Sequence, residues 1–165
     1  MKREYLDENH SSVVAGGTAA DRAARLTRTI RDQSFPNVRP RDSATLILID
    51  RAEAVPKVLL GRRHQRHRFL PGKFVFPGGR IEPADRLMAA SAALHEHHVA
   101  KLMQRVKRPS LAKAAAFALA AVRETYEETG LMLGVPVAGT MKVPPGDWEP
   151  FATAGIMPDL SQIHF

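Results

Sequence analysis

The sequence predicts a mixed α/β domain behind a lead-in segment, and three observations predict it. Residues 43–50 form a β-branched, apolar run that is typical of a buried strand. Residues 110–129 repeat apolar side chains at helical spacing, which is typical of a helix with one buried face. The chain has 165 residues, enough for one domain with its own core. We therefore expect a flexible lead-in at residues 1–40 and the domain at residues 41–165.

Two further strands are predicted before a glycine turn. Residues 57–62 have the composition of a strand, and the short turn before them would pair them with the first strand as a hairpin. A basic loop follows at residues 63–73. A short strand at residues 74–76 then ends at the turn made by Gly78 and Gly79.

Two helices are predicted after the glycine turn. Residues 85–106 are rich in alanine, leucine and methionine, and Pro109 ends this helical pattern. Ser110 is a good N-cap for the second helix, and Gly130 is a good C-cap. The expected buried stripe of this second helix consists of Leu111, Ala114, Ala115, Phe117, Ala118, Ala121, Val122 and Thr125.

The net charge of +7 is concentrated before the glycine turn. Residues 54–81 contain no aspartate or glutamate but carry seven lysines and arginines. Such a basic block attracts phosphate, on a small ligand or on a nucleic acid, although a solvated surface loop is the alternative explanation.

Composition also excludes several classes of protein. The chain contains no cysteine, which excludes disulfides and thiolate metal sites and is compatible with a reducing cytoplasm. No run of 18 apolar residues is present, so no membrane span is expected. His95, His97 and His98 could indicate a zinc site, but no HExxH pattern accompanies them, and surface histidines are the favoured interpretation.

Three glutamates near the end of the second helix carry the chemical signal. Glu124, Glu127 and Glu128 stand at i, i+3 and i+4, on one face of one helical turn. Carboxylates are unfavourable at a helix C-terminus, so helix stability alone does not explain this cluster. Their spacing indicates a hard divalent cation, Mg²⁺ or Mn²⁺. A solvated acidic face, with an Arg123–Glu127 pair, is the alternative.

Together with the glycine turn, these residues resemble the Nudix hydrolase box, G-x5-E-x7-R-E-U-x-E-E-x-G-U, where U is a bulky apolar residue. Gly79 matches the first position, and the segment from Arg123 to Leu131 matches the second half, with Thr125 at the first U position. Asp85 stands where the family has glutamate. Between Asp85 and Arg123 lie 37 residues, whereas the family has 7, which implies a helical insertion at about residues 86–109.

A second motif is similar to that of coenzyme A-cleaving Nudix enzymes. Their pattern is Leu-Leu-Thr-x-Arg-(Ser/Ala)-x3-Arg-x3-Gly-x3-Phe-Pro-Gly-Gly. Residues 59–79 match it without a gap, with arginines at Arg63 and Arg68 and a glycine at Gly72, although Gly61 and His64 depart from it. Arginine binds phosphate in a bidentate manner, which suits a ligand that carries a diphosphate and a 3′-phosphate.

The resemblance implies a fold and a set of roles. The fold would be an α/β/α sandwich around a mixed sheet. Glu124, Glu127 and Glu128, with the Gly79 carbonyl, would hold Mg²⁺ or Mn²⁺, and Arg123 would orient the glutamates. The substrate-binding residues would be Arg63, Arg68, Gly72, Gly78 and Gly79. The role of Asp85 is open, because it is one methylene shorter than glutamate and could instead cap the inserted helix.

The C-terminal segment is shorter than the resemblance implies. Residues 131–133 look like the start of a strand, residues 143–158 look irregular with Trp148 as their anchor, and residues 163–165 look like an incipient strand. We therefore expect part of the sheet and the closing helix to be missing, which would leave an open edge and an exposed core face.

The expected activity is metal-dependent cleavage of a diphosphate bond in coenzyme A or acyl-coenzyme A, giving 3′,5′-ADP and (acyl) 4′-phosphopantetheine. One alternative is another nucleoside diphosphate substrate, such as NADH or ADP-ribose. An alternative of another class is a non-catalytic module that binds nucleotide or RNA. A small-molecule diphosphate is the favoured partner over nucleic acid, a homodimer is compatible with the sequence, and the expected location is cytoplasmic.

Overall fold

The β-structure of the domain consists of short antiparallel strand pairs. The computed structural model describes residues 18–20, 39–66 and 71–165, and within them it contains four such pairs. The pairs are β1 (Ser43–Thr45) with β6 (Gly78–Arg80), β2 (Ile49–Asp50) with β3 (Lys57–Val58), β4 (Gly61–Arg62) with β5 (Phe74–Val75), and β7 (Gly134–Pro136) with β8 (Ile156–Pro158). The chain divides into the units Lys2–Pro40 and Arg41–Phe165, and all these strands belong to the second.

The predicted hairpin is confirmed for β2 and β3, next to its turn, whereas β1 pairs with β6 and β4 with β5. The predicted glycine turn is wrong. Ile49 pairs with Val58, as the hairpin requires. Gly78 and Gly79 lie within β6 and pair with β1, so they are part of a ladder and not its end. Glycine suits this place because Gly78 lies against the backbone of the neighbouring strand: a Cβ on it would lie 2.4 Å from the Ala44 carbonyl oxygen.

One face of these strands is apolar and exposed. The register partners Ile49 and Val58 share a face, and side chains two positions along each strand share it as well. The exposed fractions of the apolar side chains on this face lie between 36% and 56% for Ile47, Ile49, Val58, Leu60, Phe74 and Phe76. The α3 helix instead packs on β1 and β6.

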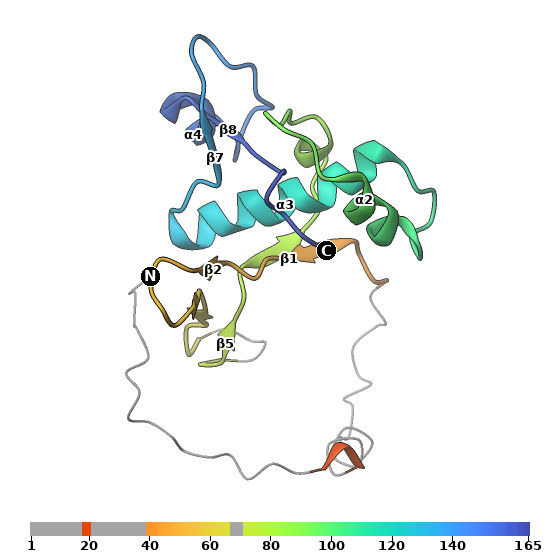
Figure 1. Ribbon diagram of the computed structural model, residues 1–165, viewed down its shortest axis with the longest axis vertical. Helices are drawn as coiled ribbons and strands as arrows, with labels where there is room; N and C mark the ends of the chain where they lie inside the picture. Colours follow the sequence, from red (N-terminus) through yellow and green to blue (C-terminus); the bar gives the residue numbers. More distant parts are fainter. Residues whose placement is uncertain (1–17, 21–38, 67–70) are drawn as a thin grey trace. The chain divides into compact units, whose positions relative to one another are not determined.

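The α3 helix (Leu111–Thr129) confirms the predicted second helix and its caps. The Ser110 hydroxyl accepts a hydrogen bond from the Lys113 N–H at 3.1 Å, and Gly130 ends the helix in the left-handed conformation with φ 75°. Figure 1 shows α3 lying between β1 and the segment that carries β7, α4 (Glu149–Ala154) and β8. The helix is therefore covered on two sides, and this position holds its side chains in place.

The main core lies between α3 and the segments that cover it. It consists of Met88, Leu94, Ala118, Leu119, Val122, Met141, Trp148, Phe151 and Leu160. The predicted stripe is only partly right, because Leu111 is 77% exposed while Leu119, which the stripe omitted, is 2% exposed. A helix buried on two sides cannot be described by one stripe.

The predicted helix at residues 85–106 is wrong in its extent. A 3₁₀ turn, η1, covers only Ala84–Arg86, and a short helix, α2, covers Glu96–Met103. Between them, Ser91 donates its backbone N–H to the Pro158 carbonyl at 2.8 Å, and Ala92 forms a bridge with Asp159. Pairing with the C-terminal segment thus overrides the helical propensity of this alanine-rich stretch.

The C-terminal segment has more regular structure than the sequence predicted. The stretch predicted as irregular contains α4 and β8, and the strand predicted at residues 131–133 begins instead at Gly134. Residues 163–165 form no strand. Trp148 is confirmed as an anchor, with an exposed fraction of 0%. Among the described helices, none has the length and apolarity needed to cross a bilayer.

Candidate active site

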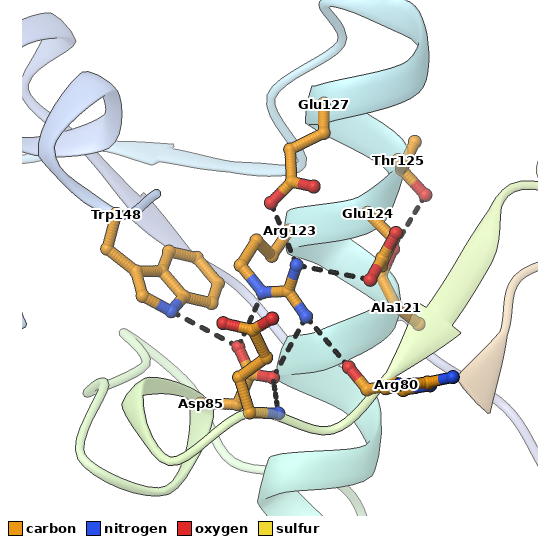
Figure 2. Close-up of polar contacts among 9 residues, drawn as sticks. Arg80, Asp85, Ala121, Arg123, Glu124, Thr125, Glu127 and Trp148 are labelled. Atoms are coloured by element: carbon orange, nitrogen blue, oxygen red, sulfur yellow. Dashed lines mark hydrogen bonds and ion pairs between the residues drawn. The ribbon is translucent and has the colours of Figure 1, made fainter. Parts of the chain in front are cut away.

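The two halves of the split motif meet at Arg123. Its Nε donates to Asp85 Oδ1 at 2.9 Å and its Nη2 donates to Asp85 Oδ2 at 3.2 Å, a bidentate ion pair between η1 and α3. The same Nη2 donates to the Arg80 carbonyl at 2.9 Å, at the end of β6. The two halves of the motif are therefore in direct contact, although 37 residues separate Asp85 from Arg123 in the sequence (Figure 2).

The remaining face of Arg123 holds two of the three glutamates. Its Nη1 donates to Glu124 Oε1 at 3.1 Å and to Glu127 Oε1 at 2.8 Å. A guanidinium has five N–H donors. The two hydrogen bonds to the glutamates, the two to Asp85 and the one to the Arg80 carbonyl engage all five. Arg123 is only 2% exposed, and its hydrogen bonds fix the directions of the carboxylates around it.

Asp85 is saturated with hydrogen-bond donors. Its side chain is fully buried, and besides Arg123 it accepts the Glu82 backbone N–H at 2.8 Å and the Trp148 indole N–H at 3.2 Å. Figure 2 shows the carboxylate of Asp85 between the indole and the guanidinium. Both oxygens are thus committed to protein donors, so Asp85 supports Arg123 and does not cap the α2 helix, whose N-cap is His95.

The two glycines of β6 lie against the glutamates of α3. A Cβ on Gly79 would lie 2.1 Å from Glu124 Oε1, so the backbone at Gly79 touches that carboxylate closely. The Gly78 backbone N–H hydrogen-bonds the Glu128 carboxylate, and the charge of Arg63 acts on the same group. Backbone and carboxylates therefore share one surface, which the two motif halves build jointly.

The pKa values of two of the glutamates are raised, mainly because their carboxylates are partly buried. Burial raises the pKa of Glu124, the charge of Arg123 opposes this, and the charge of Glu127 adds to it. Burial also raises the pKa of Glu128, while Arg63 opposes the rise. For Arg123, burial alone would lower the pKa, but hydrogen bonds with Asp85 and Glu127 raise it above its ordinary value, so the guanidinium stays charged.

The donor chemistry fits a hard divalent cation. The carboxylates of Glu124, Glu127 and Glu128 offer oxygen atoms, which Mg²⁺ and Mn²⁺ prefer as ligands. Burial raises the pKa values of Glu124 and Glu128, and a bound cation would favour their charged forms. As arranged, two of these carboxylates are directed at Arg123, and no three acidic or histidine side chains in the described ranges converge as metal ligands.

The structure brings together most of the predicted substrate-binding residues. Gly78 and Gly79 lie at the glutamate surface, and the charge of Arg63 acts on Glu128. Gly72, with φ 68°, closes the turn after Arg63 and donates its N–H to the Arg63 carbonyl at 3.1 Å, so it shapes the loop. Arg68 lies outside the described residues.

The histidines predicted as a zinc alternative lie elsewhere. His95 and His97 are exposed at the start of α2, and the His98 ring lies beside that of His164, with His98 Nε2 3.0 Å from His164 Nδ1. Sequence reasoning did miss one site residue, Trp148, which it treated only as an anchor. The sequence signal for that role is slight: the chain has one tryptophan, and nothing links it to Asp85.

Comparison with solved structures gives the class of the fold. A crystal structure of a Nudix hydrolase from Alicyclobacillus acidocaldarius matches this chain with a TM-score of 0.54 and 31% sequence identity. The match covers 75% of this chain and 59% of that one, so the chain spans little more than half of the neighbour's length. The domain therefore has the α/β fold of a Nudix hydrolase over the matched part. Neither a protein-family model nor a curated protein matches the sequence.

A pH prediction follows from the raised pKa of Glu128. A carboxyl group whose pKa is higher in the folded state than in the unfolded state favours folding at low pH and loses this contribution as pH rises. Without divalent cations, Glu128→Gln should therefore stabilise the protein at pH 7–8, and this advantage should shrink as pH falls toward the ordinary value of 4.5. Urea unfolding of both proteins from pH 5 to 8 in EDTA measures it; a constant difference would contradict the stated pKa shift.

Proposed function

We propose that this chain is a Nudix hydrolase that cleaves a diphosphate bond, with coenzyme A or an acyl-coenzyme A as its substrate. The observation that carries the proposal is the meeting of the two motif halves, in which Gly79 touches Glu124 and Asp85 pairs with Arg123. The similarity to a solved Nudix hydrolase supports a hydrolase acting on acid anhydrides.

In this proposal the three glutamates bind the cation and Arg123 orients two of them. Glu124, Glu127 and Glu128, with the Gly79 carbonyl, would hold Mg²⁺ or Mn²⁺, which would neutralise diphosphate charge and lower the pKa of a bound water. Arg123 holds Glu124 and Glu127 through hydrogen bonds from its Nη1. Hydrolysis adds water across the P–O–P bridge, so each product leaves as a phosphate monoester.

Recognition of the substrate is assigned to the basic side of the site. Arg63 lies close enough to Glu128 to oppose the rise of its pKa, so a phosphate held near the glutamates would also be near this guanidinium. In this proposal Arg68, Gly72 and the Gly78–Gly79 backbone also bind the substrate, as the sequence motif implies. Coenzyme A, with a diphosphate and a 3′-phosphate, offers the charge that a basic loop of this kind can bind.

The experiment is a substrate panel with one active-site variant. The purified chain with Mn²⁺ or Mg²⁺ is incubated with coenzyme A, NADH and ADP-ribose, and products are identified by mass. We expect 3′,5′-ADP and 4′-phosphopantetheine from coenzyme A, and a loss of about 100-fold or more in kcat for Glu127→Gln. Glu96→Gln, on an exposed helix, is the matched control and should behave as wild type.

The outcomes separate the candidate functions. Cleavage of NADH or ADP-ribose without cleavage of coenzyme A would keep the enzyme class and reject the substrate. Nucleotide binding with no hydrolysis in any mixture would favour the binding module. Because Glu127 is partly exposed and its pair with Arg123 lies on one helix, Glu127→Gln should remain folded, which circular dichroism checks.

A further inference from the structure

Trp148 lies at the end of a hydrogen-bonded chain that leads to the glutamates. Its indole is fully buried, and its N–H donates to Asp85 Oδ1, the same oxygen that accepts from Arg123 Nε. From Arg123 the chain continues through Nη1 to Glu124 and Glu127. Two hydrogen-bonded side chains therefore separate the indole from the carboxylates assigned to the cation (Figure 2).

The indole is itself held firmly. Its ring packs against Phe151 with ring centroids 5.0 Å apart, and Phe151 in turn packs edge-on against Tyr126 of α3 at 5.3 Å. The Trp148 carbonyl accepts the Phe151 N–H at 3.1 Å, at the start of α4. A donor fixed in this way can hold an acceptor in one orientation.

We propose that Trp148 is a positioning residue for the glutamates and acts through Asp85 and Arg123; this inference rests on the proposed function. The Asp85 carboxylate is fixed on three sides, by the Glu82 N–H, the indole and the guanidinium. Without the indole N–H, Asp85 Oδ1 keeps only its hydrogen bond from Arg123 Nε, so the carboxylate is held less firmly. Arg123 then loses its fixed plane, and with it Glu124 and Glu127 lose their fixed directions.

The variant Trp148→Phe tests this because it keeps an aromatic ring in the core and removes the N–H donor, together with the smaller ring of the buried indole. Isothermal titration with Mn²⁺, without substrate, should show cation affinity reduced about 10-fold, the lower range for loss of an outer partner of a metal ligand. The loss in steady-state hydrolysis should fall mainly on kcat, with KM for the substrate nearly unchanged. Leu160→Ala is the matched control: it removes a buried side chain of the same core outside the hydrogen-bonded chain, and should lower stability with Mn²⁺ affinity unchanged.

A measurement on the wild-type protein needs no variant. Trp148 is the only tryptophan of the chain, so intrinsic emission reports on this indole alone. Titration with Mg²⁺, which is diamagnetic, should change the emission with the same Kd that calorimetry with Mg²⁺ gives, and the change should be absent in Glu127→Gln.

Each result has a distinct meaning. Unchanged Mn²⁺ affinity in Trp148→Phe, or Mg²⁺ binding that leaves the emission unchanged, would overturn the positioning role, and substrate hydrolysis by the wild type would still support the proposed function. A wild-type protein that neither binds Mn²⁺ nor hydrolyses any substrate would overturn the proposed function, and this inference with it.

Discussion

Replacement of Asp85 by asparagine should lower the free energy of unfolding by about 3 kcal/mol, the lower end for breaking a buried ion pair from one side. Arg123 is 2% exposed and its raised pKa keeps it charged, so the variant leaves a buried cation without its bidentate partner. The lower end applies because Glu124 and Glu127 still contact Nη1. The asparagine NH₂ would also point a donor at other donors.

Urea denaturation measures this effect. A domain of this size is stable by about 5–15 kcal/mol, so a loss of 3 kcal/mol is a large fraction and corresponds to a fall in Tm on the order of 10 °C. Asp147→Asn is the control, since Asp147 is exposed next to Trp148. Asp85→Glu keeps the charge and should retain more stability than asparagine. A loss below about 1 kcal/mol for Asp85→Asn would show that the ion pair contributes little.

The α3 helix could be predicted from sequence because its signals are local. Ser110 and Gly130 cap it through contacts within the helix ends, and the helical period alone places Glu124 and Glu128 on one face. The first hairpin was predictable for a similar reason, since its strands follow each other and pair in register. Elements that are stabilised by their own residues are the ones that sequence patterns describe well.

The parts that sequence patterns missed depend on distant contacts. The predicted helix from residue 85 fails because Ser91 bonds to Pro158, and Asp85 finds Trp148 63 residues away. Spacing offered the Arg123–Glu127 pair, at i and i+4, but could not show that the same nitrogen would also bind Glu124, because that depends on the burial of the guanidinium. The motif thus named the candidate residues, whereas the contacts between Asp85 and Trp148 follow only from packing.

Substitution of alanine for Gly79 should remove activity and leave the fold intact. The new Cβ would lie 2.1 Å from Glu124 Oε1, but that atom is the far end of a flexible side chain and can move away. The structure therefore accommodates the methyl group by displacing the Glu124 carboxylate. A displacement of about 1 Å in an active site can lower the rate about 100-fold, so we expect a loss of that order in kcat and weaker Mn²⁺ binding.

The same substitution at Gly78 should have the opposite result. There the Cβ would lie 2.4 Å from the Ala44 carbonyl oxygen and 2.7 Å from Thr45 Cα, both of which are backbone atoms in β1. Neither can rotate away, so β1 and β6 must separate or shift, at a loss of about 3 kcal/mol. Gly78→Ala should therefore unfold at clearly lower urea concentration, whereas Gly79→Ala should unfold close to wild type.

Gly139→Ala measures how much stability an alanine costs through backbone strain alone, without a steric clash. Gly139 has φ +86° and nothing within 4 Å of its added Cβ, so alanine there carries only the strain of a left-handed conformation, about 1 kcal/mol. If Gly78→Ala were no less stable than Gly139→Ala, the close approach of β6 to β1 would not limit the site. If Gly79→Ala kept full activity and Mn²⁺ affinity, the contact between β6 and Glu124 would have no role in catalysis. The two adjacent glycines would then be needed only for strand pairing, and the proposal that Gly79 and Glu124 belong to one active site would be wrong.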